Sequence, residues 1–99
     1  QEDHVSMACH AAYRLQEMNR NLSRIIGIEL LTACQGVEFR LPLKTGKALE
    51  AVIATVRRKV EPLADDRYLA DDLLCAETLV ASGDVLAPLA AEILPCYSI

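Results

Sequence analysis

The sequence predicts an all-α protein, and three observations carry that prediction. Apolar residues recur at helical spacing along proline-free stretches, no stretch alternates apolar and polar residues as a strand does, and no internal repeat is present. Hydrophobic residues make up 53% of the 99 residues. Average usage is about 45–50% even when glycine is counted. So short a chain cannot hide that much apolar surface, and we expect a piece of a larger protein or an obligate oligomer.

A long helix is predicted over residues 3–39, where no proline occurs. Asp3 is a plausible N-cap, because its carboxylate can accept hydrogen bonds from the first free N–H groups of a helix. Steps of four and three place one apolar face on Ala11, Leu15, Met18, Leu22 and Ile25. The opposite, polar face carries Arg14, Glu17, Asn21 and Arg24.

The second part of this helix, residues 25–34, is apolar on nearly every side, which is typical of a helix inside a bundle. Gly27 interrupts it at a cost of about 1 kcal/mol relative to alanine. We therefore expect a close helix crossing or a bend at this glycine. Unbroken, the helix is roughly 55 Å long at its rise of about 1.5 Å per residue, which is too long for a compact 99-residue globule.

Shorter helices are predicted over residues 46–99. Pro42 marks a connection, Thr45 is a plausible N-cap, and Pro62 is expected to end the second helix. The inner face of that helix is predicted to carry Leu49, Val52, Ile53, Val56 and Val60.

A third helix is predicted over residues 70–81, after the acidic turn of Asp65 and Asp66. Gly83 is expected to terminate it in the left-handed conformation. The predicted apolar residues of this helix are Leu73, Leu74, Ala76, Leu79 and Val80. A last short helix is predicted from about residue 88 to residue 93, before Pro95.

The charge pattern makes several classes of partner poor candidates. The net charge is −4 and the ten basic residues are scattered, so nucleic acid is not expected as a partner.

No apolar run reaches the roughly 18 residues of a membrane span, and no secretory leader opens the chain. We expect a cytoplasmic protein. The first residue is Gln1, and we expect this start to be a cut in a longer chain.

The four cysteines are Cys9, Cys34, Cys75 and Cys96. They are far apart and form no C-x-x-C pair. Two disulfides are possible, but isolated cysteines in helical patterns favour buried free thiols.

Residues 1–7, Q-E-D-H-V-S-M, resemble a segment of the histidine ammonia-lyases, which are aromatic amino acid lyases. Residues 28–36, 42–45 and 65–70 follow in that family's order and spacing, and Leu94-Pro95 is similar to its chain end. The likeness covers essentially the whole chain. Tyrosine and phenylalanine lyases tend to carry N-Q-D-V at the first block, so Glu2 and His4 favour the histidine branch. Ala8 and Asp71 depart from the usual glycine and proline.

The resemblance implies the C-terminal helical part of a lyase that converts L-histidine to trans-urocanate and ammonia. Its electrophile, a methylidene-imidazolone ring built from Ala-Ser-Gly, is expected upstream of this chain, so the chain alone should be inactive. Glu2 is implied as the catalytic residue, and Gln1, Glu2 and His4 are implied to bind substrate. Glu2 could hold an imidazole N–H or an ammonium, or could accept a proton. The long helix is implied to belong to a bundle shared by four subunits.

Alternatives remain beside this interpretation. Without the family, Glu2 is simply an acid favoured near a helix N-terminus. His4 and His10 are six residues apart and fall on different faces of a helix, so no metal site is expected.

Ala81-Ser82-Gly83-Asp84 resembles the ring-forming sequence, but it lies downstream of Glu2 and Val85 breaks the register. We treat it as a coincidence at a helix end. A helical self-association module, a tyrosine or phenylalanine lyase, or an aminomutase remain as alternative functions.

Overall fold

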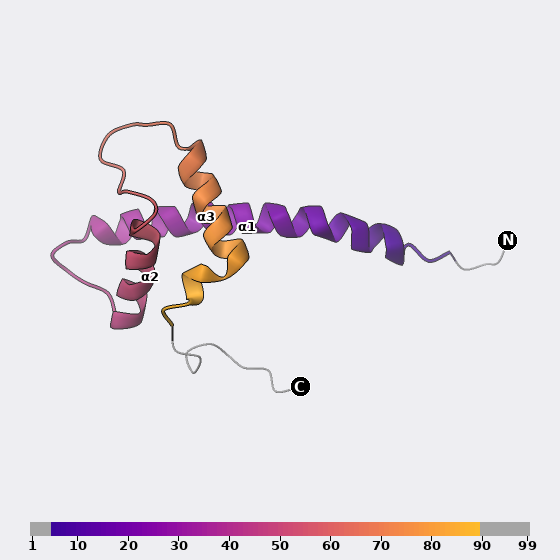
Figure 1. Cartoon of the computed structure of the whole chain (residues 1–99), viewed down its shortest axis with the longest axis horizontal. Coiled ribbons are helices and arrows are strands. Elements are labelled where there is room, and N and C mark those ends of the chain that lie inside the picture. Colours follow the sequence, from indigo (N-terminus) through magenta and orange to yellow (C-terminus); the bar gives the residue numbers. More distant parts are fainter. Residues whose placement is uncertain (1–4, 90–99) are drawn as a thin grey trace.

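The computed structural model describes residues 5–89, and Figure 1 shows their arrangement. Three α-helices follow one another: α1 (Ala8–Glu38), α2 (Lys47–Arg57) and α3 (Ala70–Ser82). A short 3₁₀ turn, η1 (Asp84–Leu86), follows α3. Between residues 5 and 89 the chain forms no strand. The all-α prediction is therefore confirmed.

Helix α1 begins later than predicted. Met7 occupies the N-cap position, so Asp3, which lies outside the described residues, is not the N-cap. Residues 5–7 precede the helix, and the Ala8 N–H donates to the Ser6 hydroxyl over 3.3 Å. At the other end, α1 stops at Glu38 with Phe39 as the C-cap, one residue before the predicted end. The prediction of one long, continuous helix is otherwise correct.

Helix α2 is shorter at both ends than the pattern suggested. Gly46, in an extended conformation, is the N-cap, and the Thr45 N–H instead donates to Glu50 Oε1 over 3.0 Å. The helix ends at Arg57, before Pro62 is reached. Leu49, predicted on the inner face, is 57% exposed. The physical reason is visible in Figure 1, where the first turn of α2 lies away from α1 and only its last turn meets that helix.

Helix α3 agrees closely with its prediction and extends one residue further. Gly83 has φ 80°, the left-handed conformation expected at the helix end. Ala76 and Leu79 are buried as predicted, but Leu74 is exposed, because only one face of α3 is covered. Pro88, where the last short helix was predicted to begin, lies in a turn; most of that predicted helix lies outside the described residues.

The core is small and lies where the three helices meet. Cys34 of α1, Val56 of α2 and Leu79 of α3 form its buried centre. Partly buried apolar side chains pack around this centre: Leu30, Leu31, Ile53 and Val85. Most of the contacts between elements are made where α3 crosses α1.

Gly27 lies at that crossing, which confirms the predicted close approach. A Cβ atom built on Gly27 would lie 3.0 Å from the Glu77 backbone nitrogen and 3.1 Å from the Ala76 carbonyl carbon. Helix α1 runs through Gly27 without interruption. The glycine therefore permits contact between two backbones and does not break the helix.

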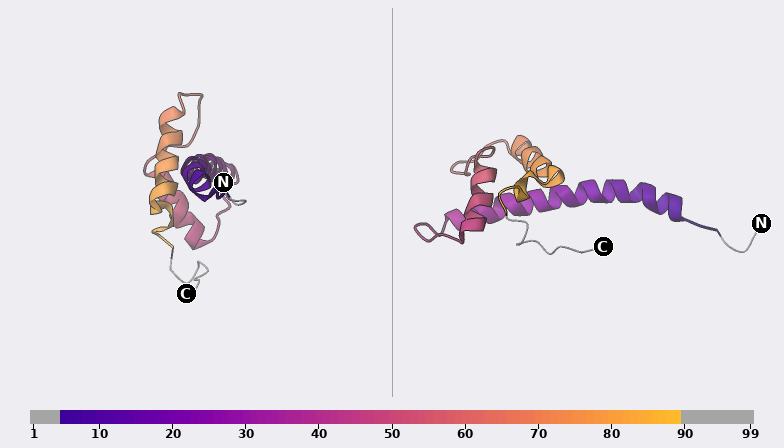
Figure 2. Two further views of the ribbon diagram at one scale, coloured as in Figure 1. Left: turned by 90° about the vertical axis from the view of Figure 1, so that its right-hand side faces the viewer. Right: turned by 60° about the horizontal axis from the view of Figure 1, so that its bottom comes forward.

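The described chain is elongated (Figure 1). Helices α2 and α3 both lie across the C-terminal half of α1 at steep angles, and the N-terminal half projects beyond them (Figures 1 and 2). The predicted apolar face of that half, which includes Leu15, Met18, Leu22 and Ile25, is exposed. None of the helices of the described chain is long and apolar enough to cross a membrane.

Candidate functional site

The residues predicted to form the site, Gln1, Glu2 and His4, lie outside the residues that the structure describes. Their described neighbours Val5 and Met7 are exposed. Residues 5–7 lead into the N-terminal end of α1, which is the end of that helix farthest from the core (Figure 1).

The first half of α1 is not covered by any other part of the described chain. Every side chain from residue 5 to residue 22 is exposed, including His10. The charged groups nearest this end, Arg14, Glu17 and Arg20, point into solvent. Within residues 5–89, no cluster of three or more His, Cys, Asp or Glu side chains could hold a metal ion. The described residues at this end therefore form no enclosed site of their own.

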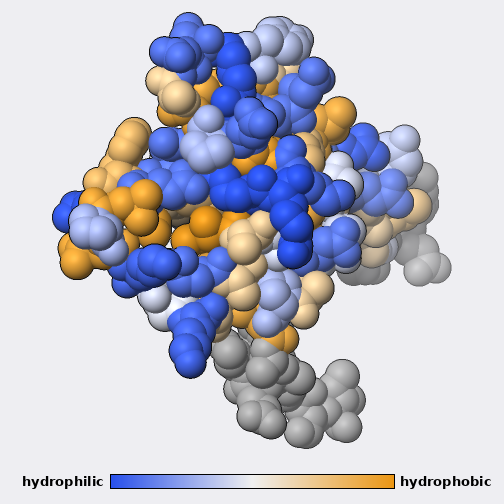
Figure 3. Space-filling view, turned by 60° about the vertical axis from the view of Figure 1, so that its left-hand side comes forward, coloured by the Kyte–Doolittle hydropathy of each residue, from blue (hydrophilic) through white to orange (hydrophobic). Residues whose placement is uncertain are grey.

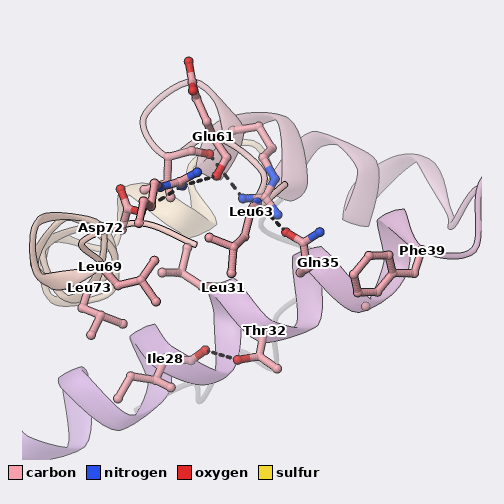
Figure 4. A pocket seen from close by; sticks show the side chains of 14 residues that line it. Ile28, Leu31, Thr32, Gln35, Phe39, Glu61, Leu63, Leu69, Asp72 and Leu73 are labelled. Carbon is pink, nitrogen blue, oxygen red and sulfur yellow. Dashed lines mark hydrogen bonds and ion pairs between the residues drawn. The ribbon is translucent and has the colours of Figure 1, made fainter. Parts of the chain in front are cut away.

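A groove of about 410 Å³ opens at the other end, beside the C-terminal half of α1. Its walls come from α1, from the segment that follows α2, and from the start of α3. Figure 4 shows Leu31, Leu63 and Leu69 turned toward one another there, with Ile28 and Leu73 at one end. Hydrophobic side chains also reach the surface between hydrophilic ones on the face seen in Figure 3.

Gln35 and Arg67, two polar residues that line this groove, are hydrogen-bonded within the chain. Gln35 Oε1 accepts a hydrogen bond from the Leu63 N–H over 2.9 Å (Figure 4). Arg67 donates to the carbonyl oxygens of Pro62 at 3.0 Å and Glu61 at 2.7 Å, and also pairs with Asp72 at 2.9 Å. Gln35 and Arg67 thus fix the loop between α2 and α3. Sequence reasoning placed both in family-like blocks and assigned neither this role, because spacing alone does not show which carbonyl an arginine will meet.

A second ion pair lies beside the groove, near the end of α1. Arg57 Nε and Nη2 donate to the two carboxylate oxygens of Glu38 at 2.6 and 2.7 Å, a bidentate geometry that fixes both side chains. In the described residues, no buried side-chain nitrogen or oxygen lacks a hydrogen-bond partner. The groove is thus lined mainly by apolar side chains, and the charged groups of Arg57, Arg67 and Asp72 beside it are paired within the chain.

Cysteines are present as free thiols at all three described positions, as expected. Only Cys34 is fully buried; Cys75 is half-buried and Cys9 is exposed, so burial was predicted wrongly for Cys9. Burial raises the pKa of the Cys34 thiol, Arg57 opposes this shift, and Glu38 adds to it. A protonated thiol is a weak nucleophile, so Cys34 acts as a small core residue.

Ser82 does not fit a ring-forming site. It is the last residue of α3, its hydroxyl oxygen lies 3.5 Å from the Leu79 carbonyl oxygen, and it accepts from the Asp84 N–H over 3.3 Å. These are the contacts of a helix end that Gly83 terminates. They agree with the interpretation of Ala81-Ser82-Gly83 as a coincidence of sequence.

Comparison with known proteins gives the family. The sequence pattern of the aromatic amino acid lyases matches residues 1–58. The histidine ammonia-lyase of Bartonella henselae (strain ATCC 49882 / DSM 28221 / CCUG 30454 / Houston 1) is 53% identical over 95 residues. These residues are 96% of this chain and 19% of that protein, so the chain spans about a fifth of its relative's length. A match over more than half of the chain, together with an all-helical fold, shows that the chain belongs to the aromatic amino acid lyase family.

Proposed function

We propose that this chain is the C-terminal part of a histidine ammonia-lyase, which removes ammonia from L-histidine to give trans-urocanate. The observation that carries the proposal is the 53% identity to a histidine ammonia-lyase over nearly the whole chain. Q-E-D-H at residues 1–4 supports the histidine branch over the tyrosine and phenylalanine lyases.

Within this proposal, Glu2 is the catalytic residue and Gln1, Glu2 and His4 contact the substrate. The β-proton of histidine is weakly acidic, so its removal needs a positioned base. A carboxylate in a water-poor pocket has a raised pKa and can serve as that base. In its charged form the same carboxylate can bind the imidazole N–H or the ammonium group. Glu2 precedes α1 in the sequence, and this position is compatible with either role, proton acceptor or substrate-binding carboxylate.

The electrophile of the proposed reaction is the methylidene-imidazolone ring, which activates the amine for departure when it is present. The described residues do not fit this group, because their Ala-Ser-Gly sequence is the end of helix α3. We therefore assign the ring to a part of the enzyme outside this chain. The isolated chain is accordingly inactive in this proposal.

The proposal also gives the first half of α1 a role in assembly. No other described residue covers its apolar face. Its polar face carries charges of both signs, with Arg14 and Glu17 three residues apart. A helix of this kind is stabilised by packing against other helices. We propose that further copies of this helix cover the apolar face in a homo-oligomer.

A chimera tests the enzymatic proposal directly. This chain would replace the matching 95-residue segment of the Bartonella henselae histidine ammonia-lyase. We expect the chimera to form urocanate, measured by its ultraviolet absorbance, and the isolated chain to form none. Glu2→Gln in the chimera should lower kcat/KM by roughly a hundredfold or more.

Glu17→Gln is the matched control, because it makes the same chemical change at an exposed site of α1. It should leave kcat/KM unchanged. A folded chimera without activity, or turnover by the purified isolated chain, would contradict the proposal. Equal activity of the Glu2→Gln and parent chimeras would remove Glu2 from the catalytic machinery.

A further inference from the structure

We draw no further inference here: the strongest candidate, the apolar groove between the second half of α1, the segment after α2 and the start of α3, is an uncovered face, and nothing in the structure shows what covers it.

Discussion

Gly27 determines how closely α1 and α3 approach each other. The atoms that a Cβ would meet belong to the backbone of α3, at Ala76 and Glu77, and backbone atoms cannot move aside as the end of a side chain can. Glycine in a helix interior costs about 1 kcal/mol relative to alanine. That cost is offset here by the close packing of the two helices.

Replacing Gly27 by alanine should therefore destabilise the chain relative to the same change at Gly36. Both residues lie inside α1, so the gain in helix propensity is common to both variants. Nothing lies within 4 Å of a Cβ at Gly36, whereas overpacking at Gly27 costs about 1–3 kcal/mol. Urea unfolding followed by circular dichroism measures the difference. Equal unfolding free energies for Gly27→Ala and Gly36→Ala would show that the two helices separate at no cost.

Cys34 is the second residue whose environment leads to a prediction. Burial raises its pKa, so the folded chain holds the thiol proton to a higher pH than the unfolded chain does. The resulting stabilisation is complete below the ordinary thiol pKa and is lost as the pH rises through the raised value. The free energy of unfolding should therefore fall on the alkaline side, and Cys34→Ala should reduce that fall.

Cys9→Ala is the matched control, since Cys9 is exposed and should leave the pH dependence as it is. Labelling of the parent chain with iodoacetamide gives an independent measurement. Cys9 should react rapidly, and Cys34 should react only when the chain opens. Equal labelling rates for both thiols would be incompatible with a buried Cys34.

Two ion pairs join the helices, and their burial differs. The Glu38–Arg57 pair connects α1 to α2 with side chains 22% and 14% exposed. The Arg24–Glu77 pair connects α1 to α3 at 2.9 Å, but Arg24 is 55% exposed. Water and salt screen an exposed charge, so the second pair contributes less to stability than the first.

Glu38→Gln should consequently cost more stability than Glu77→Gln. We expect about 1–3 kcal/mol for Glu38→Gln, since a half-buried guanidinium loses its charged bidentate partner. For Glu77→Gln we expect about 0–1 kcal/mol. Urea unfolding at low and high salt measures both, and added salt should weaken only the Arg24 pair appreciably. An equal loss in the two variants would mean that burial does not distinguish the pairs.

Sequence reasoning predicted those features of the elements that depend on local chemistry. The extent of α3 and the left-handed Gly83 follow from residues next to one another in the chain. Periodicity gave the apolar face of α2 but not how far α1 covers it, so Leu49 was placed inside and is exposed. The start of α1 was placed at Asp3 because its side chain can cap a helix, but the N-cap is Met7, and the apolar pattern does not fix the first turn.

The candidate site, like the helices, was predicted from the sequence only in part. Gln1, Glu2 and His4 were identified only through the resemblance to the lyase family. Three polar residues at the start of a chain do not by themselves indicate a binding site. The groove beside α1 could not be predicted, since it depends on which residues of three elements meet. Gln35 and Arg67 hold one wall of it through bonds to backbone groups of residues 61–63.

At the scale of the whole molecule, apolar surface exceeds what three helices can cover. The core is confined to the C-terminal half of α1, while Leu15, Met18, Leu22 and Ile25 of the other half remain exposed. Among residues 5–89, nothing packs against this apolar face, and an isolated helix of this kind is only marginally stable in water. In the isolated chain, this half of α1 should therefore either unwind or pack against a helix of another molecule.

We expect the isolated chain to self-associate through this face. Burial of one leucine, isoleucine or methionine side chain contributes about 1.5–3 kcal/mol, so burial of these four side chains favours a dimer or tetramer with helices side by side. Light scattering across a hundredfold dilution would detect it. The double variant Leu15→Gln with Leu22→Gln should shift the chain toward monomer. Leu43→Gln, which changes an exposed leucine in the loop after α1, should not. A monodisperse monomer at every concentration would refute this prediction, because the continuous helix α1 would then hold its apolar face in water without a partner.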